Sequence, residues 1–330
     1  MLSVVVPARD AAPLLRETLP ALLASLPSEA ELIVVDDGSR DDTADVARSL
    51  GAHSVLCQAP AGPAAARNRG AAAAKGDPIV FLDADVRVHP DTLQRLIAPL
   101  SEPGVAAAFG SYDATPGARS WVSLYKNLAH HFVHQRSRPE ASTFWAGCGA
   151  MRRDAFRAAG GFDAGYRRPS IEDVELGYRL RAAGFRIRLV PEAQVTHLKR
   201  WSLATWLVSD LRDRAIPWAR LVRAGRGLPA DLNFTPRDRA ASLLVGAGLV
   251  ALAAAALDVR ALGLAAACFV VASALDAPLL AFLARQVSWP FAAAAAVLQW
   301  LHRAAGLLGF ALGVLRPAPR RSERGEPPSS

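Results

Sequence analysis

Short apolar runs that end abruptly at acidic residues dominate the N-terminal part of the chain. Three of these runs are predicted strands, at residues 2–6, 31–35 and 78–82, and helix-like stretches at 13–25 and 42–50 lie between them. A strand that is buried on both faces typically has such a continuous apolar run. Alternating strands and helices predict an α/β fold with a parallel sheet and right-handed crossovers, so that the three strand ends meet at one rim.

Carboxylates follow each of these predicted strands. Asp10 follows the first, Asp36 and Asp37 the second, and Asp83 and Asp85 the third. In open α/β sheets, ligands bind just beyond the carboxyl ends of the strands. Mg²⁺ typically binds through one or two carboxylates together with the phosphates of a substrate, so Asp83 and Asp85 are candidates for a metal–diphosphate site. The alternative is a solvated turn, because aspartate is common in turns.

Four segments in a fixed order make the interpretation more specific. They are Pro7-Ala8-Arg9-Asp10, Val34-Val35-Asp36-Asp37-Gly38-Ser39, the stretch from Gly62 to Gly70, and Asp83-Ala84-Asp85. Together they resemble the ordered signature of family 2 glycosyltransferases with the GT-A fold, and the resemblance covers residues 1–200. It implies a Rossmann-like, mostly parallel sheet of the nucleotide-diphospho-sugar transferase type. It also implies a UDP- or GDP-sugar donor, a divalent metal ion (Mg²⁺ or Mn²⁺), and an inverting transfer that uses a carboxylate base.

The resemblance also implies roles for individual residues. Pro7 and Asp10 would line the nucleoside pocket, one of Asp36 and Asp37 would accept a hydrogen bond from the base, and Arg67 would lie near the phosphates. Asp85 would be the more direct metal ligand, with Asp83 toward the ribose or the metal shell. The family's first motif usually continues with asparagine and glutamate, whereas this chain has Asp10 and Ala11, so the contact of that glutamate is missing.

A general base is expected at the start of a later helix. The segment Ile171-Glu172-Asp173 resembles the family's Glu-Asp motif, and Asp173 matches the base. A helix N-terminus favours the ionised carboxylate, which is the form that accepts a proton. The alternative is that Glu172, Asp173 and Glu175 merely suit a first helical turn, with Arg179 as a surface partner of Glu175.

The acceptor side is expected around Trp145, Gly147 and Gly149, with Glu172 beside them. Glycine permits close backbone approach to a ligand, and an aromatic face is a common platform for a sugar. The alternative is a strand and turn packed in the core. His197 follows a short predicted strand at 187–190, and the resemblance implies that it completes the metal shell.

The C-terminal third of the chain predicts membrane association. Apolar stretches at 240–257, 261–275 and 289–315 predict two or three transmembrane or re-entrant helices, since a span needs about 20 apolar residues. Before them, residues 201–235 mix Trp and Leu with Arg, which is typical of amphipathic helices lying in the membrane interface. The basic tail, 316–330, is expected to be disordered.

The expected topology depends on the last apolar stretch. With the catalytic domain in the cytoplasm, three spans would place the basic tail outside, against the positive-inside tendency. Two spans with an interfacial or re-entrant third would keep it inside, and Gln299, His302 and Arg303 favour this arrangement. No charged region or cleavage site precedes the first strand, so no signal peptide is expected and the protein is predicted to be a multi-pass inner-membrane protein.

Composition agrees with a membrane lipid as partner and excludes nucleic acid. The net charge is +8, but the excess arginine lies beside apolar stretches rather than in a stripe on one domain. The sequence therefore predicts a membrane-anchored glycosyltransferase that acts on a lipid-linked or membrane-proximal acceptor. Two alternatives remain, a processive polysaccharide synthase subunit and a non-catalytic nucleotide-binding scaffold. His197 occupies the glutamine position of the Gln-x-x-Arg-Trp motif of processive members, which disfavours the first.

Overall fold

The computed structural model describes residues 1–226, 232 and 235–315, and the chain forms two units. Unit 1 comprises residues 1–118 and 134–200. Unit 2 comprises residues 119–133 and, within the described part, residues 201–315. Residues 119–133, which the sequence analysis assigned to the catalytic domain, therefore belong to unit 2, and the predicted disordered tail 316–330 lies outside the described residues.

Unit 1 is an α/β domain, which confirms the predicted fold class. Its strands are β1 (Leu2–Ala8), β2 (Ala30–Asp36), β3 (Ser54–Cys57), β4 (Ile79–Leu82), β5 (Val86–Val88), β6 (Val105–Tyr112), β7 (Glu140–Ala141), β8 (Cys148–Met151) and β9 (Arg186–His197). Its helices are α1 (Ala12–Ser25), α2 (Thr43–Ser49), α3 (Pro63–Ala73), α4 (Thr92–Ile97), η1 (Ala98–Ser101), α6 (Arg153–Ala158) and α7 (Glu172–Ala182).

All nine strands belong to one sheet. Its order is β3-β2-β1-β4-β8-β6-β9-β5, and β7 pairs with β9. The first four of these are parallel, as predicted, but β8 runs antiparallel to both β4 and β6, so the sheet as a whole is mixed. This reversal has a consequence for the rim. Because β8 starts where β4 ends, the backbone N–H of Asp83 donates to the carbonyl of Gly147 (3.2 Å), which brings the two predicted site segments together.

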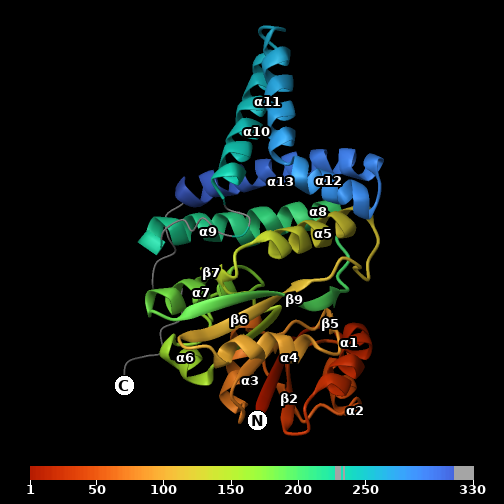
Figure 1. Ribbon diagram of the computed structural model, residues 1–330, viewed down its shortest axis with the longest axis vertical. Coiled ribbons are helices and arrows are strands. Elements are labelled where there is room, and N and C mark those ends of the chain that lie inside the picture. The colour runs from red at the N-terminus through yellow and green to blue at the C-terminus, as the bar shows by residue number, and fades with distance from the viewer. Residues whose placement is uncertain (227–231, 233–234, 316–330) are drawn as a thin grey trace. The chain divides into compact units, whose positions relative to one another are not determined.

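The core explains why β1 has an unbroken apolar sequence. Val4 and Val6 pack in the cluster formed with α1, α2 and α4, whereas a Cβ atom on Gly70 of α3 would clash with Val5. Successive side chains of a strand point to opposite faces, so helices cover both faces of this strand. Figure 1 shows the sheet with α1, α3 and α4 packed around it. The carboxyl end of the strand leads into the short loop before α1 that contains Asp10.

Unit 2 is helical in its described residues. It contains the first part of α5 (Trp121–Arg136), then α8 (Leu203–Val208), η2 (Ser209–Ala215), α9 (Ile216–Leu221), η3 (Val222–Arg226), α10 (Pro236–Ala254), α11 (Ala261–Leu275), α12 (Ala277–Gln286) and α13 (Trp289–Leu315). From the start of α8 to Ala224 the chain is one continuous helix that includes π-helical turns, and Gly225, with a φ of 77°, interrupts it within η3. Pro217 does not break it, because the wider turns at Ser209–Ala215 precede the proline and accommodate its missing N–H.

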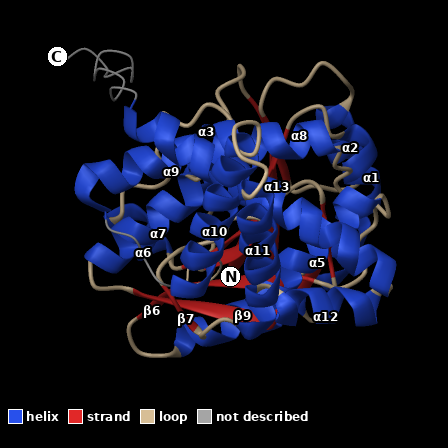
Figure 2. Cartoon of the chain, turned by 90° about the horizontal axis from the view of Figure 1, so that it is seen from above, coloured by secondary structure: helices blue, strands red, loops and turns tan. Residues whose placement is uncertain are grey.

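The structure offers one or two candidate spans, where the sequence predicted two or three transmembrane or re-entrant helices. Within residues 1–226 and 235–315, only α13 is by itself long and apolar enough to cross a membrane. The pair α11–α12 would be a second candidate if counted as one span, but it bends by 67°. The predicted span 240–257 lies mostly in α10, which starts with charged residues, and α11 has 15 residues. Figure 2 looks down on α10 and α11, which pack against each other.

Candidate functional site

The loop after β4 is held by a buried cation. Arg67 on α3 donates through Nη2 to Asp83 Oδ1 (2.7 Å) and through Nη1 to Glu172 Oε1 (2.8 Å) at the start of α7. Its guanidinium also lies over the ring of Phe162, with 5.5 Å to the centroid. Arg67 is 5% exposed, so these contacts, rather than contact with solvent, determine its position. The sequence analysis placed Arg67 near the donor phosphates, and the structure places it between two carboxylates.

Asp173, the predicted base, lies beside this ion pair. Its Oδ2 accepts a hydrogen bond from the backbone N–H of Ala146 (3.1 Å), and its Oδ1 accepts one from Val174 (2.8 Å). Burial and the neighbouring charge of Glu172 raise the pKa of Asp173 to about 7, against the opposing effects of Arg67 and the two hydrogen bonds. A carboxyl group with a pKa near the working pH is suited to accept and release a proton.

A second cluster lies on the other side of the Asp83 loop. Asp85 Oδ2 is 3.7 Å from His197 Nε2, and the His197 ring stacks on Tyr112 with centroids 4.2 Å apart. Tyr112 in turn contacts Trp145 edge to face, at 4.9 Å. Burial raises the pKa of Asp85, but the His197 imidazole and the charge of Lys199 lower it more, so that its pKa lies below the usual range. Asp85 is therefore an ionised, partly exposed carboxylate at physiological pH.

These residues suit a divalent cation. The side chain of Asp83 is 34% exposed and that of Asp85 is 19% exposed. Arg67 is the cation facing Asp83, Glu172 and Asp173, and Lys199 acts on Asp85, so the carboxylates outnumber the cations. Among the residues that the structure describes, no group of three His, Cys, Asp or Glu side chains is arranged as a complete metal site. Mg²⁺ and related ions often take only one or two protein carboxylates and complete their shell with substrate phosphates and water. The chemistry of Asp83, Asp85 and His197 fits an ion of this kind.

The predicted donor residues after β1 and β2 hold their own loops. Asp37 accepts three hydrogen bonds, from Gln58 Nε2, Ala61 N and Gly62 N, all at 2.8 Å. Asp36 Oδ1 accepts hydrogen bonds from the backbone and hydroxyl of Ser39. Asp37 thereby fixes the start of α3, and with it the position of Arg67.

Asp10 and Pro7 lie at the corner where the family's glutamate is missing. Asp10 has a positive φ of 48°, and its Oδ1 accepts a hydrogen bond from Arg40 N (2.7 Å). Pro7 lies within β1, in register with Val35 of β2. The loop after β1 is therefore tied to the loop after β2 by the side chain of Asp10.

The predicted acceptor segment consists of tightly packed aromatic and glycine residues. A Cβ atom on Gly147 would lie 2.7 Å from the Trp145 ring, and one on Gly149 would lie 2.4 Å from Phe144. Both glycines are thus required by packing, whatever their contact with a ligand. Glu172 is buried and bonded to Arg67 and to Ser170 N, so its carboxylate is directed toward α3.

The sequence analysis missed Tyr112, which joins the two halves of the site. It ends β6 and contacts both His197 and Trp145. The available signal was an aromatic residue at the end of an apolar stretch, Val105–Tyr112, that was not recognised as a strand. Alanine-rich segments have low strand propensity, which explains the omission.

Comparison with known proteins adds independent information on unit 1. Residues 3–160 match the model of the family described as glycosyl transferase family 2, and residues 126–201 match a model described as N-terminal domain of galactosyltransferase. A pre-mycofactocin glycosyltransferase of Mycobacterium tuberculosis is 33% identical over 261 residues, covering 74% of this chain and 50% of the relative. A validoxylamine A glucosyltransferase of Streptomyces hygroscopicus is 29% identical over 228 residues, covering 58% and 50%. The chain spans about half the length of these curated relatives.

One solved structure is similar along most of the chain. It is a mannosyltransferase from Pyrobaculum calidifontis, determined in complex with GDP-Man and Mn²⁺. The TM-score is 0.59 at 21% identity, and the match covers 95% of this chain and 87% of the other. At this identity the likeness concerns the fold, which is that of the GT-A transferases.

Proposed function

The chain belongs to glycosyl transferase family 2 through residues 3–160, and we propose that it transfers a sugar from a UDP- or GDP-sugar, with inversion, to an acceptor at a membrane. The observation that carries this proposal is the position of Asp173. This carboxyl group has a pKa of about 7 and lies next to the ion pairs that hold the Asp83 loop. A base and a candidate diphosphate site are thus adjacent, as a direct displacement requires.

Asp173 would accept the proton of the acceptor hydroxyl as that oxygen attacks the anomeric carbon. The hydrogen bond from Ala146 N–H orients the carboxylate, and Val174 N–H at the helix start favours its charged form. Arg67 acts as a positioning residue, because it ties Glu172, which precedes Asp173, to Asp83 on the donor side. In this way the distance between base and donor is fixed by one buried guanidinium.

Asp85, with His197 and Asp83, would hold a divalent metal ion on the donor diphosphate. When bound, such an ion supplies Lewis-acid stabilisation of the leaving phosphates. The chain's own contribution is to keep Asp85 ionised and the His197 ring fixed against Tyr112. The nucleoside is assigned to the loops around Pro7, Asp10, Asp36 and Asp37, and the acceptor sugar or hydroxyl to the surface of Trp145.

The membrane part of the proposal rests on unit 2. Apolar side chains such as Leu243, Val250, Leu264 and Val270 are exposed on α10 and α11, which is unusual for a soluble protein and typical of contact with lipid. An enzyme anchored in this way meets acceptors that are themselves in the membrane. We therefore favour a lipid-linked acceptor, such as a polyprenyl phosphate or a lipid-linked glycan, at the cytoplasmic face of the inner membrane.

The test is a screen of purified protein in lipid against UDP- and GDP-sugars, with Mg²⁺ or Mn²⁺ and with or without a membrane lipid extract. Release of nucleoside diphosphate and of labelled lipid product would be measured. We expect turnover of one donor that requires the metal, increases with lipid, and is lost in Asp173→Asn but retained in Asp91→Asn. Asp91 is a matched control, since it is an exposed aspartate that precedes α4 and pairs with Arg95. Donor binding without turnover under every condition would refute the proposal and favour a nucleotide-binding scaffold.

A further inference from the structure

The helix that is long enough to cross a membrane is held along a charged helix of the same unit. His302 Nδ1 of α13 is 2.6 Å from Asp210 Oδ2, and Arg223 Nη1 donates to the carbonyl of Val314 (2.7 Å). Between these contacts, a Cβ atom on Gly309 or Gly313 would clash with the segment from Leu211 to Ala219. Residues 302–314 of α13 therefore lie side by side with residues 210–223, in the same direction.

That neighbouring helix cannot lie inside a bilayer. From Asp210 to Arg223 it has six charged residues, and Arg212, Arg214 and Arg223 are exposed. Charged side chains facing lipid are strongly disfavoured in the hydrocarbon region. A location of α13 across the bilayer would place these residues there as well. The contacts therefore favour α13 at the membrane surface.

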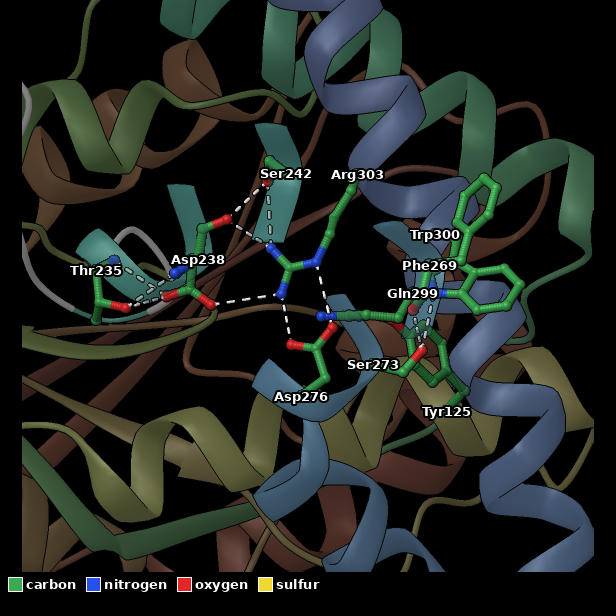
Figure 3. A network of polar contacts seen from close by, with 10 residues as sticks. All are labelled: Tyr125, Thr235, Asp238, Ser242, Phe269, Ser273, Asp276, Gln299, Trp300 and Arg303. Carbon is green, nitrogen blue, oxygen red and sulfur yellow. Dashed lines mark hydrogen bonds and ion pairs between the residues drawn. The ribbon is translucent and has the colours of Figure 1, made fainter. Parts of the chain in front are cut away.

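The polar residues of α13 all point toward protein. The Tyr125 hydroxyl donates to Gln299 Oε1, and Arg303 Nη2 is 2.5 Å from Asp276 Oδ1 (Figure 3). His302 contacts Asp210. The exposed large residues of the helix are apolar, among them Val297, Leu301, Leu308 and Leu315. An apolar outer face and a polar inner face are typical of a helix that lies in the plane of the interface.

The pair α10–α11, in contrast, has the residue distribution of helices that are inserted in lipid. Most buried residues of the two helices are small, and Gly248 packs against Cys268 and Phe269. Apart from the buried Val245, most of the larger aliphatic side chains, among them Leu243, Val250, Leu264 and Val270, are exposed. Helices that associate in lipid have small residues at their interface, whereas a soluble pair would bury the larger ones. From Ala240 to Leu257 the chain has no charged residue, and α10 is helical as far as Ala254. The helical part of this stretch is about 22 Å long, which with the apolar turn that follows reaches most of the way across a hydrocarbon core of about 30 Å.

Arg303 connects α13 to the α10–α11 pair, at the end where α10 begins and α11 ends. Its guanidinium binds Asp276, at the bend between α11 and α12, and the carbonyl of Asp238 and the hydroxyl of Ser242 at the start of α10 (Figure 3). α13 thus meets α10 and α11 near their ends, and Figure 1 shows both helices rising away from α13. Because Asp276 is bound by Arg303, the bend between α11 and α12 is stabilised and the two helices do not form one straight span.

We propose that the α10–α11 hairpin is the part of unit 2 that enters the hydrocarbon core of a lipid bilayer, and that α13 lies along the membrane surface beside α9. This inference rests on the membrane association in the proposed function, and it identifies the segment that is inserted into the bilayer. It assigns the N-terminal catalytic unit and the tail after α13 to the same side of the membrane. The tip of the hairpin, Asp258 to Arg260, lies at the other side or within the bilayer.

The test uses three single-cysteine proteins and a membrane-impermeant maleimide, applied to right-side-out and inverted vesicles. One keeps the exposed native Cys57 with Cys148 and Cys268 replaced by alanine, and the others place Val259→Cys or Ser322→Cys in a cysteine-free background. We expect Cys57 and the S322C thiol to react from the same side, and the V259C thiol to react from the other side or only after detergent. Leu257→Cys, at a position that is 95% exposed, is a second tip reporter should V259C fold poorly.

Two results would overturn the inference and are distinguishable from failure of membrane association. Labelling of the S322C thiol from the side opposite to Cys57 would mean that α13 spans the bilayer. Labelling of the tip from the same side as Cys57, in membrane-bound protein, would mean that the hairpin does not insert. Recovery of the chain in the soluble fraction after carbonate washing would instead refute the membrane association itself, and glycosyl transfer by that soluble protein would leave the enzymatic part of the proposed function standing.

Discussion

Replacement of Glu172 by glutamine should move the acidic limb of the pH–rate profile to lower pH while transfer is retained. The pKa of Asp173 is about 7 because its partly exposed carboxyl group is desolvated by the surrounding protein and because Glu172 adds a negative charge. The base must be ionised, so the rate of the parent enzyme should rise as the pH passes through about 7. Without the charge of Glu172 the pKa of Asp173 falls, and Asp173 becomes ionised at lower pH.

The magnitude follows from the size of such charge effects. A neighbouring charge commonly displaces a carboxyl pKa by about one unit, which is about 1.4 kcal/mol. At pH 6 a base with a pKa of about 7 is roughly one-tenth ionised, and after a one-unit decrease it is about half ionised, so the relative rate there should rise about fivefold. Glutamine has the shape of glutamate and can still accept the hydrogen bond from Ser170 N. It loses the ion pair with Arg67, which keeps Asp83 as its partner.

The assay is kcat/KM for the donor between pH 5 and 9, because this quantity reports the pKa of the free enzyme. Glu175→Gln is the matched control. Glu175 is on the same helix, is buried and pairs with Arg179 (2.6 Å), yet it is not among the groups that shift the pKa of Asp173. The assignment of Asp173 as the base would be refuted if the acidic limb of the pH–rate profile did not move in E172Q, or if it moved equally in E172Q and in Glu175→Gln.

Further predictions concern the metal, the fold and unit 2. Asp85→Asn should lower kcat about 100-fold or more and weaken the metal requirement, whereas Asp91→Asn should change kcat by about twofold at most; equal effects would contradict the role of Asp85. Asp173→Asn should abolish transfer, yet it should raise the free energy of unfolding by up to about 4 kcal/mol above pH 7 and leave it unchanged below pH 4, as measured by urea unfolding. The reason is that the pKa of Asp173 is raised in the folded state, so its ionisation destabilises the fold as the pH rises. Arg303→Leu should destabilise unit 2 by about 3–5 kcal/mol, since it leaves Asp276 buried without its cation. The double variant with Asp276→Leu should recover most of this loss in thermal unfolding in detergent, and a double variant as unstable as the single one would refute the ion-pair explanation.

The sheet rim could be predicted from the sequence because local patterns determine it. Strands β1, β2 and β4 are buried on both faces, so their sequences are continuous apolar runs, and the acids that follow them lie at the carboxyl ends of parallel strands. The position of Asp173 at a helix start was predictable for the same reason, since Glu172–Ala182 has its acids in the first turn and its arginines in the last.

The contacts that join these segments were not predictable. Arg67 and Glu172 are 105 positions apart, and nothing in either segment indicates that the guanidinium faces two carboxylates rather than a phosphate. The antiparallel insertion of β8 between β4 and β6 likewise depends on pairing with distant strands, and it is this pairing that brings Gly147 beside Asp83. Patterns of period 2 or 3.6 identify the face of an element, but they do not identify its partner.

In unit 2 the polar residues that interrupt apolar stretches were more informative than the stretches themselves. Hydropathy treats residues 261–275 and 289–315 as comparable candidates, yet Asp276 and Arg303 pair with each other and thereby couple the end of one to the middle of the other. A buried ion pair contributes little net stability, because desolvation offsets the attraction, but it strongly disfavours every arrangement in which one charge is left alone. If α11 and α12 formed one straight span, or if α13 crossed the bilayer away from them, Asp276 and Arg303 would each be left unpaired. The pair therefore acts mainly by excluding alternative topologies.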